Sequence, residues 1–439
     1  MKNKLYILLI LFCGIISSKG QSKLTISEAV KNTLENNLEI KYYENLEKIS
    51  KNNSSILNNN YLPNVQLGTD LNTNIQNIEI ETPDGLSGQL DNSKIDNNNS
   101  TISLNYNIID ASGRRFNYKK SKELYSKSKL EVKEIIENTL MQLFSIFFEV
   151  GRLTEEKNIL QNTLQISKER YKRKLVQFEY GQTNKLEILN AEVDVNSDSI
   201  NLLNTSKELS NVKRDLNLIM NVNLDNNFEI ESSINFTEKA ILIDAYGKGI
   251  IGNTKFLISE KDIIISDLED KATKFSYLPT IGLIGSYGWN ESINDNPYAF
   301  YNKSFSNGFT AGLSVRWNLF SGGKRITANK NSKIYYENTE ITKEKIKLEL
   351  ESEFKNAYQT HLNNIYILEA QEKNLEVNKD NFERNKEKYK IGSISSIEFR
   401  NAQLNLLNAQ LRENIFRYQA KISELYFLKL SGQIISRFK

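Results

Sequence analysis

The chain has 439 residues, which is enough for two or three ordinary domains. Its 57 basic and 54 acidic residues leave a formal net charge of +3, so no excess of basic charge points to nucleic acid. No stretch after the first twenty residues is apolar over the roughly 20 residues that a transmembrane helix needs. Any part of the chain that spans a membrane must therefore consist of strands.

Residues 1–20 are predicted to be a secretory signal peptide. Lys2 and Lys4 precede an apolar run, and small residues stand before the expected cleavage site. Cys13 is the only cysteine and lies inside this segment, so the mature chain has no thiol or disulfide chemistry. A lipoprotein with Cys13 lipidated is the alternative, although Phe12 stands where a small residue is usual.

The rest of the chain is predicted to be two copies of one unit, 21–230 and 231–439. The motifs that recur in order are Tyr61-Leu62-Pro63 with Tyr277-Leu278-Pro279, Tyr106-Asn107-Ile108-Ile109 with Trp317-Asn318-Leu319-Phe320, and Phe178-x-x-Gly181 with Tyr389-x-x-Gly392. An ordered series across the whole chain indicates duplication, with a period far longer than that of solenoid repeats. Each copy is predicted to run helix, strand, loop, strand, very long helix, turn, helix.

A mostly helical stretch from Thr25 to about Asn60 opens the first copy, with Ser27 as its expected N-cap. Its counterpart in the second copy runs from about Phe236 to Ser276. Pro63 and Pro279 end these helices, because proline cannot continue the hydrogen-bond ladder.

Strand pairs are predicted at 62–110 and 278–320, because apolar and polar residues alternate there. The apolar positions are Val65, Leu67 and Leu71; Ile102, Leu104, Tyr106 and Ile108; Ile281, Leu283, Tyr287 and Trp289; and Ala311, Leu313, Val315, Trp317 and Leu319. Asp70 and Arg316 fall on the opposite face. Alternation over about ten residues is typical of membrane barrel strands, with aromatic side chains at the interfaces. A soluble sheet with one buried face gives the same alternation.

The segments between the strands of each pair, Glu81–Asn99 and Asn290–Asn307, are rich in turn-forming residues. They are predicted to be outward-facing loops. From Ser112 to Glu179 and from Ile326 to Ile391 the chain is predicted to be helical, over about 100 Å at ~1.5 Å per residue. Apolar residues recur there at intervals of three and four residues, so each helix needs a partner helix along its length. A soluble coiled-coil rod has the same features.

The segment Gly247–Gly252 fits the spacing G-x-G-x-x-G of dinucleotide-binding loops. No parallel βαβ unit surrounds it, as such a loop requires. In the repeat register Gly252-Asn253 falls on Asn36-Asn37, which favours a break between two short helices.

Each long helix leads into a turn motif, at 178–187 and at 389–398. The two motifs continue as Phe178-Glu179-Tyr180-Gly181-Gln182-Thr183-Asn184-Lys185-Leu186-Glu187 and Tyr389-Lys390-Ile391-Gly392-Ser393-Ile394-Ser395-Ser396-Ile397-Glu398. The glycines, Gly181 and Gly392, suit the left-handed conformation that ends a helix. The next helices are expected to be capped by Thr183 and Ser395.

Both turn motifs, on a duplicated plan of strands and long helices, resemble the TolC outer-membrane efflux family over nearly the whole mature chain. The resemblance implies an α+β membrane protein in which three chains form a homotrimer in contact with outer-membrane lipid. Each chain gives four strands to one twelve-stranded β-barrel, and the coiled-coil-like helices continue it as a tunnel through the periplasm. An inner-membrane transporter and a periplasmic adaptor (membrane fusion protein) dock at the tip. The function implied is passive exit in efflux or type I secretion.

The resemblance also places carboxylates at the constricted tunnel entrance. Glu187 and Glu398 stand where carboxylates of the family line it, and three chains would form rings of negative charge. Asn190 and Asn401 lie three residues further on, where the best-known member has a second carboxylate in its second repeat. The alternative interpretation is that both glutamates are ordinary charged residues on solvated helix surfaces.

Tyr389 resembles a tyrosine that helps hold the entrance shut, although Ile394 replaces its arginine partner. The residues implied in docking of the partners are Phe178, Gly181, Thr183, Gly392 and Ser395.

No enzyme, cofactor or metal site is predicted. His361 is the only histidine, which excludes a histidine-based triad or a site with several histidines within one chain. The competing interpretation is a periplasmic coiled-coil adaptor or structural rod. Adaptors join their helical hairpins to domains rich in Gly and Pro turns, whereas this chain has only four prolines.

Overall fold

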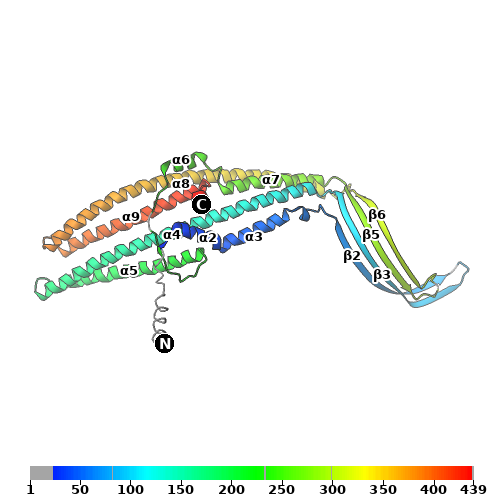
Figure 1. The fold of residues 1–439 in the computed structure, drawn as a ribbon, viewed down its shortest axis with the longest axis horizontal. Helices are drawn as coiled ribbons and strands as arrows, with labels where there is room; N and C mark the ends of the chain where they lie inside the picture. The colour runs from blue at the N-terminus through cyan, green and yellow to red at the C-terminus, as the bar shows by residue number, and fades with distance from the viewer. Residues whose placement is uncertain (1–22, 82, 232–233, 298, 438–439) are drawn as a thin grey trace, which may run out of the picture. The chain divides into compact units, whose positions relative to one another are not determined.

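The computed structural model describes residues 23–81, 83–231, 234–297 and 299–437 (Figure 1). The predicted signal peptide, with Cys13, lies outside these residues. The chain divides into two compact units. The first takes its described residues from Met1–Asn45, Leu130–Ile258 and Lys345–Lys439, and the second from Leu46–Lys129 and Ser259–Glu344.

The helices and strands follow one another as β1 (Lys23–Leu24), α2 (Ile26–Asn36), α3 (Leu38–Asn53), η1 (Ile56–Asn58), β2 (Asn64–Glu81), β3 (Ser87–Ile109), α4 (Arg114–Glu179), α5 (Lys185–Ile219), β4 (Glu229–Ile230), α6 (Lys239–Lys248), α7 (Thr254–Phe275), β5 (Thr280–Asn294), β6 (Lys303–Arg316), α8 (Lys324–Lys390), α9 (Ser396–Leu430) and η2 (Ile435–Arg437). Among the described residues, no helix is both long and apolar enough to cross a bilayer.

The second unit contains a four-stranded antiparallel sheet in the order β2-β3-β5-β6 (Figure 1). Its register brings the apolar positions of all four strands onto one face. One row across the sheet consists of Leu67, Ile102, Tyr287 and Phe309. All four side chains of this row are exposed, so the isolated chain presents a continuous apolar sheet face that nothing covers.

The strands extend much further than predicted. The predicted loop Glu81–Asn99 is wrong, because β3 begins at Ser87 and only a short turn separates it from β2. Polar residues pair across the sheet in this part, as where the Thr73 hydroxyl donates to Asp96 Oδ1 over 2.6 Å. Short polar side chains therefore do not end a strand when their backbone groups are paired across the sheet.

The second strand pair departs from prediction in the same way. Most of the predicted loop Asn290–Asn307 belongs to β5 and β6, which leaves only a short connection. At its other end β6 stops at Arg316, so Trp317 lies beyond the strand. The Trp317 indole Nε1 donates to the Tyr277 carbonyl over 3.1 Å, which ties the strand end to the chain before β5.

The N-cap of the first helix lies two residues before the predicted Ser27. Ser27 is not its N-cap, because Thr25 and Glu28 form a capping box. Thr25 Oγ1 accepts from the Glu28 amide over 3.2 Å, and Glu28 Oε2 accepts from the Thr25 amide over 3.0 Å. The reciprocal bonds satisfy two backbone donors that would otherwise lack partners.

The break predicted at Gly252-Asn253 is confirmed, since α6 ends at Lys248 and α7 begins at Thr254. Asn253 Oδ1 accepts from the amide of Lys255 over 3.0 Å, and its Nδ2 donates to the Leu430 carbonyl over 3.0 Å. The match to a dinucleotide-binding loop is thus a helix junction held against the end of α9.

The main core of the first unit lies where α4, α5 and α9 come together. The apolar stripe of α4 is buried there, with Leu143 and Phe144 at 0% exposure. Leu216 of α5 and Leu425 of α9 belong to the same cluster. In this part of α4, apolar residues spaced three and four apart are therefore buried by packing between helices of one chain.

Candidate functional site

The candidate site lies in the first unit, at the turns that join α4 to α5 and α8 to α9. Gly181 ends α4 in the left-handed conformation, with φ at 71°. The Gly181 amide donates to the Phe178 carbonyl over 2.9 Å, and the Gln182 amide to the Gln177 carbonyl over 2.7 Å. Glycine takes this conformation without strain, and the two bonds satisfy carbonyls at the helix end.

The N-cap of α5 is Asn184, so the prediction of Thr183 is wrong by one residue. Asn184 has an extended backbone, and its Oδ1 accepts from the Glu187 amide over 3.1 Å. Asparagine is as good an N-cap as serine or threonine. Thr183 instead lies within the turn.

The second turn has the same construction. Gly392 has φ at 77°, its amide donates to the Tyr389 carbonyl over 3.1 Å, and the Ser393 amide donates to the Lys388 carbonyl over 2.9 Å. Ser395 is the N-cap of α9, as predicted, and forms a capping box with Glu398. The Ser395 amide and hydroxyl lower the pKa of Glu398, because both stabilise the charged carboxylate.

The two predicted entrance glutamates have different surroundings. Glu398 is exposed and bonded to its own turn, with Oε2 accepting from the Ser395 amide over 2.8 Å. The Glu187 carboxylate lies 3.1 Å from Lys174 Nζ and is 27% exposed. Glu187 lines a surface hollow together with Asn190 and Asn401. The structure therefore brings three of the five predicted entrance residues together, whereas Glu398 and Tyr389 do not line the hollow.

Tyr389 is buried in a small aromatic cluster with Phe382, Phe399 and Ala402. Its ring stacks on Phe399 with centroids 4.5 Å apart and an interplanar angle of 3°. The Arg173 guanidinium lies 4.9 Å from the centroid of the same ring. The Tyr389 hydroxyl is buried and has no hydrogen-bond partner within the chain.

A buried ionic network behind the turns was not predicted from the sequence. Arg400 of α9 bonds Asp198 of α5 through Nη1 and Nη2, each over 2.9 Å. Ser167 of α4 donates to Asp198 over 2.6 Å. Arg170 pairs with Asp194, whose Oδ1 also lies 3.5 Å from Arg400 Nε. The spacing of Asp194 and Asp198, one helical turn apart, is the sequence signal that marks this face of α5.

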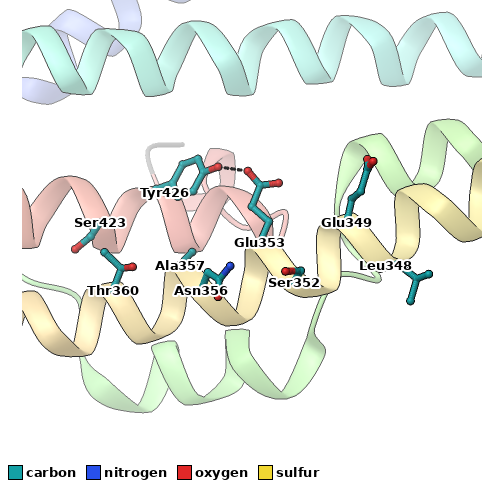
Figure 2. Close-up of a pocket in the computed structure, with 9 residues that line it drawn as sticks. All are labelled: Leu348, Glu349, Ser352, Glu353, Asn356, Ala357, Thr360, Ser423 and Tyr426. Carbon is teal, nitrogen blue, oxygen red and sulfur yellow. Dashed lines mark hydrogen bonds between the residues drawn. The ribbon is translucent and has the colours of Figure 1, made fainter.

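A second surface hollow lies between α8 and α9 (Figure 2). Its lining is made mostly of small and polar side chains, and in the view the Tyr426 hydroxyl points at Glu353, to which it donates. His361 is buried nearby on α8, with Nδ1 3.4 Å from the Ser423 hydroxyl, and burial lowers its pKa. Across the described parts of the chain no three His, Cys, Asp or Glu side chains are grouped as metal ligands would be.

The chain matches the family model for outer membrane efflux protein over residues 29–222 and 271–433, ranges that include both turns. Its fold is similar to the Campylobacter jejuni CmeC outer membrane channel, with a TM-score of 0.78 and 16% identity over 93% of this chain and 86% of that chain. The Vibrio cholerae outer membrane protein VceC gives a TM-score of 0.75 and 11% identity, over 93% of this chain and 96% of that one. The open-state Neisseria gonorrhoeae MtrE outer membrane channel gives a TM-score of 0.70 and 14% identity, over 93% of this chain and 89% of that one. Comparison with curated proteins finds no match.

Proposed function

Because this chain belongs to the outer membrane efflux protein family, we propose that three copies form the exit duct of a tripartite efflux or type I secretion system. The chain is an outer-membrane efflux protein and not an enzyme. Each copy contributes its four strands to one twelve-stranded barrel, and the helices continue the barrel into the periplasm as a tunnel. Small molecules or proteins pass through it, driven by an inner-membrane transporter and handed over by a periplasmic adaptor.

The observation that carries this proposal is the uncovered apolar face of the sheet. A face with Leu67, Ile102, Tyr287 and Phe309 exposed in one row suits hydrocarbon, and water would make it prone to aggregation. In the described sheet, β2 and β6 each have one edge without a strand partner. Pairing of β2 in one copy with β6 in the next closes the barrel and removes those edges.

The two turns form the periplasmic entrance in this proposal. Glu187, Asn190 and Asn401 line the narrow mouth, with Glu398 adding charge at its rim, so that the trimer favours cations there. Tyr389 holds the second turn against α9 through its stacking on Phe399.

The adaptor and transporter dock on the outer surface of the turns. The docking residues proposed are Phe178, Gly181, Thr183, Gly392 and Ser395. Phe178 is the apolar contact among them, with 44% of its surface exposed.

Single-channel recording in a planar bilayer tests both the duct and its entrance. The double variant Glu187→Gln/Glu398→Gln is compared with wild type and with Glu372→Gln/Glu376→Gln, which makes the same charge change at exposed positions of α8. We expect cation-selective pores whose selectivity falls only in the first variant. Pores with unchanged selectivity would place the constriction elsewhere, and a folded trimer that forms no pores would leave either a tightly sealed entrance or a periplasmic rod.

A further inference from the structure

Aromatic and basic side chains border the apolar face of the sheet where the strands meet the helices of the second unit. Arg114 begins α4, and its guanidinium lies 4.5 Å from the Tyr61 ring and 6.0 Å from the Tyr106 ring. In the second copy of the repeat, the Arg325 guanidinium lies 5.1 Å from the Tyr277 ring. Since Tyr106 belongs to the apolar face, Arg114 lies at the rim of that face.

Backbone carbonyls hold both arginines in place. The acceptors are Asn60, Asn107 and Ile108 for Arg114, and Ser276 and Asn318 for Arg325. The two copies use matching carbonyls, since Tyr61 and Tyr277, which follow Asn60 and Ser276, are equivalent in the repeat. The guanidinium groups are therefore fixed at equivalent places along the rim.

Positive charge is concentrated just beyond this rim. Residues 114–129 of α4 hold seven basic side chains and one acidic, and residues 324–333 of α8 hold four basic side chains and no acidic one. Positive charge at the start of a helix opposes the helix dipole, so helix stability does not account for this concentration.

Part of this charge is neutralised within the unit, as where Lys127 Nζ lies 2.6 Å from Asp262 Oδ1. Four basic side chains of these two segments are exposed and take part in neither an ion pair nor a cation–π contact among the described residues: Arg115, Lys119, Lys324 and Lys330. These four define the basic rim. Their charge is available to a partner outside the chain.

The basic rim adjoins a face that also needs an apolar partner. Trp317 is 58% exposed just beyond the end of β6 that meets the helices, and Leu319 and Phe320 beside it are 75% and 79% exposed. A nucleic acid or a soluble acidic peptide would satisfy the positive charge but would leave these side chains in water. A molecule with a negative headgroup and hydrocarbon chains satisfies both at once.

Resting on the proposed membrane insertion of the sheet, we propose that the basic rim binds anionic phospholipid headgroups in the leaflet that surrounds this end of the apolar face. The acyl chains lie on the sheet, the rings of Tyr61, Tyr277 and Trp317 lie at the interface, and the phosphates meet the cations. Arginine and lysine pair strongly with phosphate oxygens. The ring of anionic lipid would fix the depth of the barrel in the membrane.

Trp317 reports directly on this contact, because Trp289→Phe leaves it as the only tryptophan of the chain. The protein is reconstituted into phosphatidylcholine vesicles containing phosphatidylglycerol. Either lipid is supplied in brominated form, which quenches tryptophan fluorescence on contact. Lys324→Gln/Lys330→Gln is the test pair. Lys373→Gln/Lys379→Gln is its control, with the same spacing on α8 at exposed positions of the other unit.

We expect brominated phosphatidylglycerol to quench Trp317 more strongly than brominated phosphatidylcholine at equal mole fraction. The preference should fall by about fivefold per cation removed in the test pair and stay unchanged in the control pair. Equal quenching by the two lipids in the Trp289→Phe protein, or a preference that survives in the test pair, overturns the inference. So does a change of ion selectivity without a change of lipid preference, because the cations would then face the lumen.

The two proposals fail in different ways. A protein that conducts ions but shows no lipid preference refutes only the anionic-lipid site. A protein that forms no pores and whose Trp317 is quenched by neither brominated lipid is not in the bilayer, and the proposed function then fails with it.

Discussion

The guanidinium group of Arg400 meets the carboxylate of Asp198 in a bidentate pair, with both hydrogen bonds 2.9 Å long. Asp198 is 2% exposed and Arg400 9%, so both charges lie out of water. The pair joins α9 to α5 behind the two turns and thereby fixes one hairpin against the other. A buried ion pair of this kind is worth little in net stability but is very sensitive to loss of one partner.

Arg400→Met is therefore expected to destabilise the protein by about 3–5 kcal/mol, because it leaves the Asp198 carboxylate buried without its partner. The free energy of unfolding by denaturant measures the effect. The double variant Arg400→Met/Asp198→Leu serves as the control and should recover most of the loss. If the single variant is as stable as wild type, Asp198 is reached by water and the pair does not lock the hairpins.

The turn glycines give a second prediction. Gly181 and Gly392 have φ of 71° and 77°, and a Cβ at either position would meet nothing within 4 Å. Gly181→Ala and Gly392→Ala should each lower the free energy of unfolding by about 1–2 kcal/mol, from backbone strain alone. Substitution by Asn should have a smaller effect, because Asn tolerates the left-handed region.

Gly247→Ala is the matched control for the turn glycines. Gly247 lies inside α6, where a Cβ also meets nothing within 4 Å and no positive φ is required. Alanine there should raise the free energy of unfolding by up to about 1 kcal/mol, because alanine favours a helix interior. Equal effects of alanine at Gly247 and Gly392 would contradict the claim that the left-handed backbone conformation makes glycine necessary in the turns.

The sequence predicted these turns because their signals are local. A glycine after a long apolar-periodic helix and a capping residue before the next one specify the turn almost by themselves. The predicted N-cap of α5 is wrong by only one residue, because Thr183 and Asn184 are adjacent and both are good N-caps. Only the backbone shows that Asn184 directly precedes the first turn of α5.

The strand lengths and the ionic network could not be predicted from local sequence signals. Between Glu81 and Asn99 the alternation of apolar and polar residues fades, and pairing with the neighbouring strand, a non-local interaction, decides the conformation. Arg400 and Asp198 are 202 residues apart in the chain. No periodicity within either helix indicates a partner so far away in the sequence.

Tyr389 gives a third prediction, which separates its ring from its hydroxyl. Tyr389→Phe should leave the free energy of unfolding unchanged or slightly higher, because the hydroxyl is buried without a hydrogen-bond partner. Tyr389→Ala should lower it by about 3 kcal/mol, because the stacking on Phe399 is lost and a cavity remains. A loss of stability in Tyr389→Phe would show that the hydroxyl bonds a neighbouring copy in the assembled protein.

Glu137 gives a prediction for pH dependence. It lies on α4 with 3% exposure, and Lys133 Nζ is 3.6 Å from its Oε1. Burial raises the pKa of Glu137 above its ordinary value of 4.5, even though Thr254 and Lys133 act to lower it. Between the ordinary and the raised pKa the folded protein binds more protons than the unfolded chain. The contribution of Glu137 to stability is therefore fully present below pH 4.5 and is lost as the pH rises through the raised pKa.

Glu137→Gln removes the buried charge and keeps the shape of the side chain. At pH 7 its midpoint of thermal unfolding should lie above that of wild type, and the difference should vanish as the pH falls below 4.5. Glu134→Gln makes the same charge change one turn earlier on α4 at a half-buried position, and it should not reproduce this pattern. A stabilisation by Glu137→Gln that is the same at pH 4 and pH 7 would mean that lost packing strain, and not relief of a buried charge, is its cause.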